Sequence, residues 1–200
     1  MNNIYKYEEE IYKQGYEYIA GTDEVGRGPM AGPLVAAAVI LPKGIKIEGL
    51  NDSKKLTEKK RESLFEEILK KAVEVQIKFI SVEDVDKYNV LESSRMAMTS
   101  CIKSMKSKVD YILTDAMKLP LNIPTLDLIK GDSKSASIAA ASIIAKVSRD
   151  RYMVMLDKEF PQYGFKNHKG YVTKQHKEAL EKFGICIHHR KTFAPVSKYL

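Results

Sequence analysis

The hydrophobic positions of the chain alternate between the period of two that is typical of strands and the wider spacing that is typical of helices. Apolar runs at 18–23 and 34–41 flank a loop rich in glycine and proline, which predicts two paired antiparallel strands. Residues 73–79 alternate apolar with polar side chains and predict a half-buried strand. Two shorter apolar runs, at 111–115 and 126–129, predict two further strands.

Helical spacing occupies the segments between these strands. Thr57 is suited to cap a helix over 58–71, whose apolar residues recur on one face. A second helix is expected over 90–106, with leucine and methionine facing the core. A last helix is expected over 173–183 and is closed by Gly184, in the C-terminal part of the chain.

The longest helical stretch covers 133–160 and is stopped by Pro161. Its first half is rich in alanine, which allows close packing on a sheet. Asp132 or Ser133 is expected to cap this helix, because both residue types accept hydrogen bonds from free backbone N–H groups. Early strands in a meander, followed by strand–helix alternation, predict an α/β fold. We expect a mixed central sheet of about five strands, flanked by helices, with a helical C-terminal extension.

Composition is that of one globular domain. Apolar residues make up 44% and charged residues 30%, so a single domain is expected over 1–200, with a short N-terminal extension at 1–15. The N-terminus lacks the apolar segment of a secretory signal, and no apolar run approaches the roughly 20 residues of a membrane helix. Cys101 and Cys186 are isolated, so neither a disulfide framework nor a zinc site is indicated. We therefore expect a cytoplasmic protein without membrane contact.

The charge is distributed unevenly along the chain. The formal net charge is +7, and residues 161–200 contain eight lysines and arginines but only two glutamates. The rest of the chain is close to neutral. A basic C-terminal segment on a neutral body suits the binding of a polyanion such as a nucleic acid. A solvated, lysine-rich helical face would have the same composition, so charge alone leaves both interpretations open.

Acidic residues come at the ends of separate elements. Asp23 and Glu24 end the first predicted strand, Asp115 ends a later one, and Asp132 precedes the long helix. If the two strands are parallel neighbours, the carboxylates that follow them meet at one edge of the sheet. Carboxylates that share a site need a cation to offset their repulsion, and oxygen ligands favour Mg²⁺ or Mn²⁺ over Zn²⁺. Two such ions would suit hydrolysis of a phosphodiester.

A glycine-bracketed arginine, Gly26-Arg27-Gly28, follows the first two acids. Glycine lets backbone N–H groups approach a sugar or phosphate closely, and arginine can donate two hydrogen bonds to phosphate oxygens. Neighbouring side chains on a regular strand point to opposite faces, so Asp23 and Glu24 can converge only at a strand end or a bulge. Gly26 offers such a departure. Each acid also has a simpler explanation, as a turn residue, a strand end or a helix cap.

Four motifs in order make the chain similar to bacterial ribonuclease HII from about residue 16 to residue 195. A lone pair of acids would carry little information, whereas four ordered motifs are not explained by coincidence. The motifs are Asp23-Glu24-Val25-Gly26-Arg27-Gly28-Pro29, Asn51-Asp52-Ser53-Lys54-Lys55-Leu56, Gly131-Asp132-Ser133-Lys134 with the stretch 137–150, and His168-Lys169-Gly170-Tyr171.

This resemblance implies a ribonuclease H-like fold and endonucleolytic cleavage of the RNA strand in RNA–DNA hybrids. It also implies incision on the 5′ side of single ribonucleotides in duplex DNA, as in ribonucleotide excision repair, leaving 3′-hydroxyl and 5′-phosphate ends. The matching positions imply that the catalytic, metal-binding carboxylates are those of Asp23, Glu24, Asp115 and Asp132 rather than of the nearby Asp110 or Asp127. The resemblance also implies two substrate contacts. Gly26, Arg27 and Gly28 would contact the 2′-hydroxyl, which distinguishes RNA from DNA. Tyr171 would pack on the neighbouring deoxyribose.

Other assignments stay open. Lys54 and Lys55 are either phosphate contacts or ordinary exposed lysines, and His168 is the histidine best suited to the edge of the site. One alternative function is a non-catalytic nucleic-acid-binding protein on the same fold. Another is a relative of ribonuclease HIII, but that family has an added N-terminal domain and usually lysine in place of Arg27. No oligomerising seam is evident, so we expect a monomer.

Overall fold

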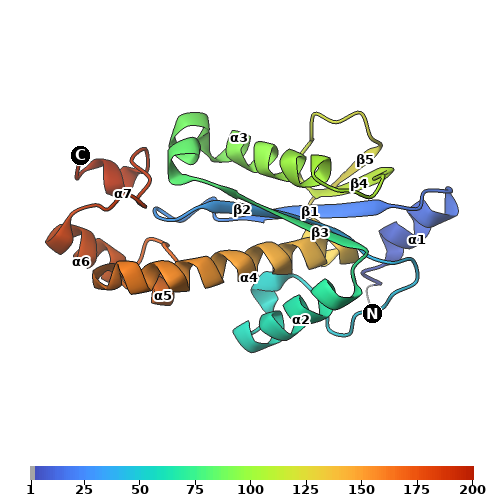
Figure 1. Ribbon diagram of the computed structural model, residues 1–200, viewed down its shortest axis with the longest axis horizontal. Coiled ribbons are helices and arrows are strands. Elements are labelled where there is room, and N and C mark those ends of the chain that lie inside the picture. Colours follow the sequence, from blue (N-terminus) through green and yellow to red (C-terminus); the bar gives the residue numbers. More distant parts are fainter. Residues whose placement is uncertain (1–2) are drawn as a thin grey trace.

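The computed structural model describes residues 3–200 and contains a five-stranded mixed sheet between layers of helices (Figure 1). The first three strands form an antiparallel meander, and the last two are parallel to β1. The predicted α/β class, the number of strands and the antiparallel pairing of the first two are confirmed. The order across the sheet is β3 (Glu74–Ile80), β2 (Leu34–Ile40), β1 (Ile19–Val25), β4 (Tyr111–Asp115) and β5 (Thr125–Leu128).

Helices cover both faces of this sheet. α2 (Glu58–Lys71) and α4 (Ala136–Glu159) lie on one side, and α3 (Val82–Lys103) lies on the other (Figure 1). Alternate residues of β2 accordingly belong to two different apolar clusters, one with α2 and α4 and one with α3. All seven residues of β2 are buried, which explains why its sequence is a continuous apolar run.

The boundaries of α3 differ from the expected 90–106. Ser81 caps the helix by accepting a hydrogen bond from the backbone N–H of Asp84, so the helix begins much earlier than the apolar spacing indicates. Asn89 has a φ of 64° and interrupts the helical backbone. Because the backbone is not helical at Asn89, a single regular period does not extend over the whole of α3.

The start of α4 also differs from the expectation. Ser135 is the cap, and its hydroxyl accepts a hydrogen bond from the backbone N–H of Ile138. The prediction that Asp132 or Ser133 caps this helix is therefore wrong. Both residues lie in the short 3₁₀ helix η2 (Gly131–Ser133) that precedes it. The Asp132 carboxylate is thereby left free for other contacts.

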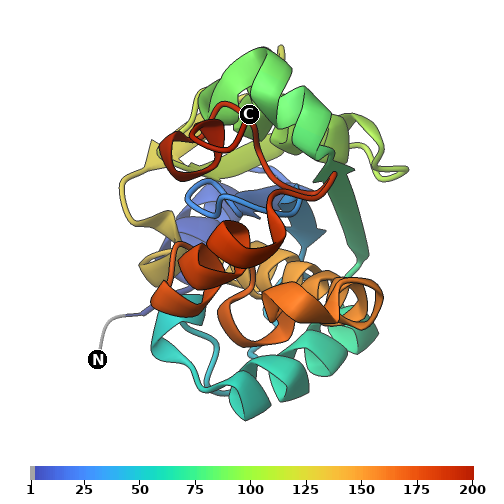
Figure 2. The ribbon, with the colours of Figure 1, turned by 90° about the vertical axis from the view of Figure 1, so that its left-hand side faces the viewer.

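The remaining helices are short and lie at the two ends of the molecule. At one end, Glu8 of α1 (Lys6–Lys13) accepts hydrogen bonds from the Ser135 hydroxyl (2.6 Å) and the Ser137 backbone N–H (2.8 Å), so the N-terminal extension is joined to the core. At the other end, the C-terminal segment runs from the α4 layer to the α3 layer (Figure 2). None of the helices within residues 3–200 has both the length and the apolarity needed to cross a bilayer. The C-terminal helices are α5 (Phe165–His168), α6 (Lys174–Phe183) and α7 (Ala194–Ser197).

Candidate active site

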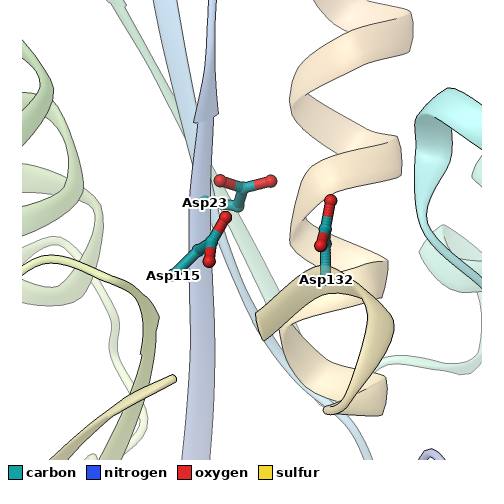
Figure 3. Close-up of side chains that lie close together, drawn as sticks. All are labelled: Asp23, Asp115 and Asp132. Atoms are coloured by element: carbon teal, nitrogen blue, oxygen red, sulfur yellow. The ribbon is translucent and has the colours of Figure 1, made fainter. Parts of the chain in front are cut away.

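Three aspartates converge where β1 and β4 end (Figure 3). One carboxylate oxygen from each of Asp23, Asp115 and Asp132 lies within 4.8 Å of the other two. β1 and β4 are parallel, with Thr22 opposite Thr114, so the next residues along both strands are neighbours. The condition for convergence, parallel and adjacent strands, is therefore met, and the pairing brings acids from distant parts of the chain to one point.

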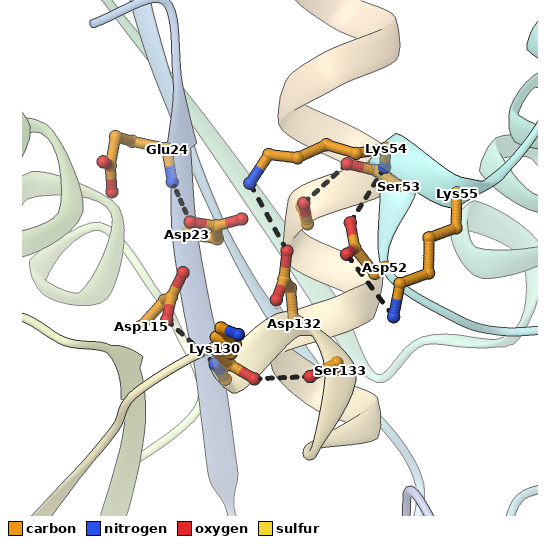
Figure 4. A network of polar contacts seen from close by, with 12 residues as sticks. Asp23, Glu24, Asp52, Ser53, Lys54, Lys55, Asp115, Lys130, Asp132 and Ser133 are labelled. Carbon is orange, nitrogen blue, oxygen red and sulfur yellow. Dashed lines mark hydrogen bonds and ion pairs between the residues drawn. The ribbon is translucent and has the colours of Figure 1, made fainter.

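The third acid is held in place by the second. Oδ1 of Asp115 accepts a hydrogen bond from the backbone N–H of Gly131 at 2.8 Å (Figure 4). This contact fixes η2 against the end of β4. Asp132, the next residue, consequently faces the other two carboxylates although it lies outside the sheet.

A glycine in β1 lets α4 approach the site. A Cβ atom on Gly21 would lie 2.2 Å from the carbonyl carbon of Ser137, closer than any side chain permits. Gly21 and Asp23 are two residues apart and share one face of the strand, and this face is the one that α4 covers. The absent side chain therefore sets the distance between Asp23 and the start of α4, which follows directly on η2.

Glu24 lies outside the three-aspartate group. β1 pairs with β2 residue by residue from Ala20 to Val25, without a bulge, so the side chain of Glu24 points to the opposite face from Asp23. Its carboxylate lies 3.5 Å from the Arg27 guanidinium. Figure 4 shows it directed away from the other acids. The strand departure that would let the two neighbours converge is absent.

The pKa values of Asp23 and Asp132 are affected by their burial and by the charges of nearby carboxylates. Burial raises the pKa of the Asp23 carboxyl well above its usual value, and the charges of Glu24 and Asp115 raise it further, against a hydrogen bond from Ser142. Burial, followed by the charge of Asp52, also raises the pKa of Asp132. Crowded carboxylates of this kind are stabilised in their charged form by a cation. Oxygen ligands at this spacing fit a hard divalent ion.

The two lysines of the second motif have different surroundings. Nζ of Lys54 lies 3.6 Å from Oδ2 of Asp132 and points toward the carboxylates (Figure 4). Lys55 instead lies 3.9 Å from Asp52 and points away. Burial lowers the pKa of Lys54, but the nearby carboxylates, Asp132 first, outweigh burial and raise it. The structure therefore brings Lys54, and not Lys55, to the acidic group.

The glycine–arginine–glycine loop lies against Tyr171. A Cβ atom on Gly28 would stand 3.7 Å from ring carbon Cε1 of Tyr171, and the tyrosine residue remains 41% exposed. Gly26 has a φ of +98°, and a Cβ there would lie 2.6 Å from Nε of Arg149. Segments that are far apart in the sequence thus form one continuous surface beside the aspartates.

Two buried arginines hold this surface together, and no sequence pattern indicates their role. Among residues 3–200, neither Arg149 nor Arg190 has a carboxylate partner within 4.0 Å, although both are fully buried. A guanidinium is normally exposed, so charge alone would place both on the surface. Their donors go instead to backbone carbonyls, those of Ala31, Pro33 and Lys169 for Arg149 and those of Arg27 and Gly32 for Arg190.

Comparison with known proteins agrees with this architecture. Ribonuclease HII from Bacillus cytotoxicus is 53% identical over 191 residues, which are 96% of this chain and 74% of that protein. Ribonuclease H2 from Pyrococcus horikoshii has a similar structure, with a TM-score of 0.81 at 27% identity over 91% of this chain and 96% of that one. Ribonuclease HII from Archaeoglobus fulgidus, solved in complex with PCNA, gives a TM-score of 0.73 at 28% identity over 88% and 95% of the two chains.

The match to the family as a whole extends over the sheet, the acidic group and the C-terminal helices. The sequence model of the Ribonuclease HII family covers residues 20–196. This span includes all four motifs and both buried arginines. The fold expected from the resemblance is confirmed by the solved relatives. The chain therefore belongs to the ribonuclease HII family and is an endoribonuclease of the ribonuclease H type.

Proposed function

We propose that this ribonuclease cleaves the RNA strand of RNA–DNA hybrids and also incises on the 5′ side of single ribonucleotides in duplex DNA, with two divalent cations. The proposal is carried by the convergence of three aspartate oxygens within 4.8 Å of one another, next to the surface that contains Gly28 and Tyr171. The acids suit the chemistry and the adjacent surface suits recognition of the sugar. The products would carry 3′-hydroxyl and 5′-phosphate ends.

Asp23, Asp115 and Asp132 would hold the cations. Divalent ions bound there would lower the pKa of a water and offset the charge of the departing oxygen. Glu24 is proposed as the fourth acid of the site. Burial raises its pKa, Arg27 opposes this, and the charge of Asp115 raises it again, so the two carboxylates interact across the strand end. Neither Mg²⁺ nor Mn²⁺ is favoured by these residues.

The substrate contacts follow the same surface. We propose that backbone groups of Gly26, Arg27 and Gly28 contact the 2′-hydroxyl, and that the exposed ring of Tyr171 packs on the adjoining deoxyribose. Lys54 is proposed to contact phosphate, whereas the pairing of Lys55 with Asp52 favours it less. The basic segment 161–200 would extend the contact along the duplex. A monomer in the cytoplasm stays a prediction.

One assay tests the proposed reaction. Two labelled duplexes, one RNA–DNA hybrid and one DNA duplex with a single ribonucleotide, are incubated with Mg²⁺, with Mn²⁺ or with EDTA. The expected result is cation-dependent cleavage of both, with the single cut directly 5′ to the ribonucleotide. Cleavage in EDTA would overturn the metal role. Binding without cleavage under every condition would favour the alternative of a non-catalytic binding protein.

A further inference from the structure

Three histidines form a buried cluster beneath Tyr171. His168, His176 and His189 come from α5, α6 and the C-terminal segment, and all three are buried. The rings of His168 and His176 are stacked, with centroids 4.2 Å apart. His168, expected at the edge of the site, is therefore an interior residue.

The protonation of His168 follows from its backbone partners. A backbone N–H can only donate a hydrogen bond, and a carbonyl can only accept one. Nδ1 of His168 accepts from the N–H of Gly170 at 3.2 Å, so this nitrogen carries no proton. The ring proton is on Nε2, which donates to the carbonyl of Tyr163 at 2.9 Å. His168 is neutral, with both ring nitrogens satisfied.

The same reasoning gives a directed chain through the other two rings. Nδ1 of His189 accepts from the N–H of Cys186 at 3.0 Å, so its proton is on Nε2. This N–H faces Nε2 of His176 at 3.0 Å, which must accept. The proton of His176 is then on Nδ1, which donates to the carbonyl of Tyr171 at 3.0 Å. The chain begins at Cys186 and ends at the backbone of Tyr171.

Every ring of the cluster is complete in its neutral form. An added proton on any of the three would set two donors against each other, at Gly170, at Cys186 or between the two Nε2 atoms. Burial lowers the pKa of His176 to about 3 and that of His189 to about 4, in agreement with this pattern. The Cys186 thiol lies 3.2 Å from Nδ1 of His189 and also contacts this chain of hydrogen bonds.

The end of this chain lies in a segment with three fixed carbonyls in succession. The carbonyl of Lys169 accepts from Arg149 at 2.9 Å, that of Gly170 from the N–H of Met30 at 2.9 Å, and that of Tyr171 from His176. The main chain of Tyr171 is thereby fixed while its ring stays exposed next to Gly28. Of the three donors, only the histidine is fixed by a further side chain, His189.

We propose that His176 and His189 are positioning residues that fix the backbone of Tyr171 and so present its ring to the sugar of the substrate. They touch neither the substrate nor the reacting atoms. The inference rests on the proposed role of Tyr171 as a substrate contact. This role differs from simple core packing because the position of Tyr171 depends on two directed hydrogen bonds. One runs from Nε2 of His189 to Nε2 of His176, and the other from Nδ1 of His176 to the carbonyl of Tyr171.

Conservative variants separate the hydrogen bonds from the packing. His176→Asn keeps an N–H donor on the atom attached to Cγ, where Nδ1 stands, whereas His176→Ala keeps none. His189→Gln keeps a donor at the position of Nε2. His188→Ala is the matched control, because this neighbouring histidine makes no side-chain hydrogen bond in the described chain. Binding of a duplex with one ribonucleotide is measured in EDTA, which removes catalysis from the readout.

The expected result is weaker binding by about ten-fold for His176→Ala, since an acceptor is left without its donor. Most of the affinity should return in His176→Asn and His189→Gln, and His188→Ala should match the wild type. In a Tyr171→Ala background, His176→Ala should add nothing. Ring ¹⁵N shifts should also show the proton on Nδ1 of His176 and on Nε2 of the other two.

Three results would overturn the positioning role while leaving the sugar contact of Tyr171 in place. One is unchanged binding in His176→Ala when Tyr171→Ala binds weakly. Another is an equal loss in His176→Asn and His176→Ala, or losses that add to that of Tyr171→Ala, as packing alone would give. If Tyr171→Ala binds like the wild type, the proposed sugar contact fails together with the positioning role. The ¹⁵N shifts then test only whether the chain of hydrogen bonds through His189 and His176 is present.

Discussion

Asp23 and Asp115 are neighbours on parallel strands, and their closeness is unfavourable unless positive charge lies between them. Lys54 supplies one ammonium group, 3.6 Å from Asp132, but this charge is shared among several acids. The pKa of Asp23 remains raised, by burial first and by Glu24 and Asp115 next. At the residue scale, protonation of these acids would therefore compete with the binding of a cation.

Replacing Asp115 tests the ligand role with little change of structure. Asparagine keeps an oxygen that can accept the hydrogen bond from Gly131, so η2 should stay in place. We expect Asp115→Asn to slow cleavage by about 100-fold or more, because a cation typically supplies several kcal/mol to the transition state. Binding of the duplex in EDTA should change little. Single-turnover cleavage and a binding titration measure the two effects, and undiminished cleavage would reject the ligand role.

The raised pKa of Asp23 predicts that cation binding releases protons. Below this pKa the cation-free site holds a proton that a bound ion must displace. The affinity for Mn²⁺ should therefore rise as the pH rises through the pKa of Asp23 and then level off. Calorimetric titrations in buffers of different ionisation enthalpy count the protons released. A Mn²⁺ affinity that does not change with pH would contradict the assignment.

At the scale of elements, α4 connects the sheet, the acidic group and the surface that contains Gly28 and Tyr171. Its first turns lie on β1 at Gly21, its middle supplies Ser142 to Asp23, and Arg149 reaches the loop after β1. α1 adds a fixed point through Glu8, which accepts from Ser135 at the cap of the helix. A shift of α4 would therefore move the acidic group and the glycine–arginine–glycine loop together.

Gly21→Ala should disturb this helix more than any exposed substitution. The added methyl group would overlap the backbone of Ser137 at 2.2 Å, so β1 and α4 must separate. We expect a loss of about 3 kcal/mol in the free energy of unfolding, at the upper end of the cost of overpacking. Gly44→Ala is the control, since its Cβ meets nothing within 4 Å and only its left-handed backbone costs about 1 kcal/mol. Denaturant titrations compare them, and equal losses would contradict the close approach of α4.

At the scale of the whole molecule, the neutral histidines should make folding sensitive to acid. Folded-state pKa values of about 3 for His176 and about 4 for His189 lie below the ordinary 6.5. Below pH 6.5 these histidines therefore bind protons in the unfolded chain but not in the folded chain. The free energy of unfolding consequently falls as the pH drops toward the folded-state pKa values. Each histidine contributes a slope of about 1.4 kcal/mol per pH unit.

The comparison with His176→Asn isolates this effect from the acids of the site, whose raised pKa values act in the opposite direction. Unfolding by denaturant is followed from neutral pH to about pH 5 for both proteins, a window below the unfolded-state pKa of histidine. With falling pH, the free energy of unfolding should decrease more steeply in the wild type than in the variant. The difference in slope should correspond to about one proton. Parallel curves would show that His176 is protonated in the folded protein.

Sequence patterns predicted the parts of this molecule that local physics determines. The five strands follow from apolar runs, and the Thr57 cap follows from side-chain hydrogen bonding. The meeting of Asp23 and Asp115 depended on parallel neighbouring strands, a condition that apolar runs alone did not decide. The first turns of α3 were missed because Asn89 interrupts the period, and the cap of α4 was misplaced because several adjacent residues were suited to it. Arg149 and Arg190 were missed because remote carbonyls, and not their neighbours in sequence, satisfy their donors. The hydrogen-bonded pair of His176 and His189 was missed because only folding brings the two rings together.

The two buried guanidinium groups have a consequence for how the enzyme senses a nucleic acid. Burial lowers the pKa of Arg149 to about 10. Burial and the charge of Arg149 lower that of Arg190 to about 9. Within residues 3–200, no carboxylate lies within 4.0 Å of either guanidinium, although Asp150 and Asp86 are near enough to oppose these shifts. Their charges are buried next to the glycine–arginine–glycine loop, where dissolved ions screen them less than exposed charges. The phosphate backbone of a bound duplex would bring negative charge close to both arginines. Part of the attraction between protein and duplex should therefore persist at salt concentrations that screen the surface lysines.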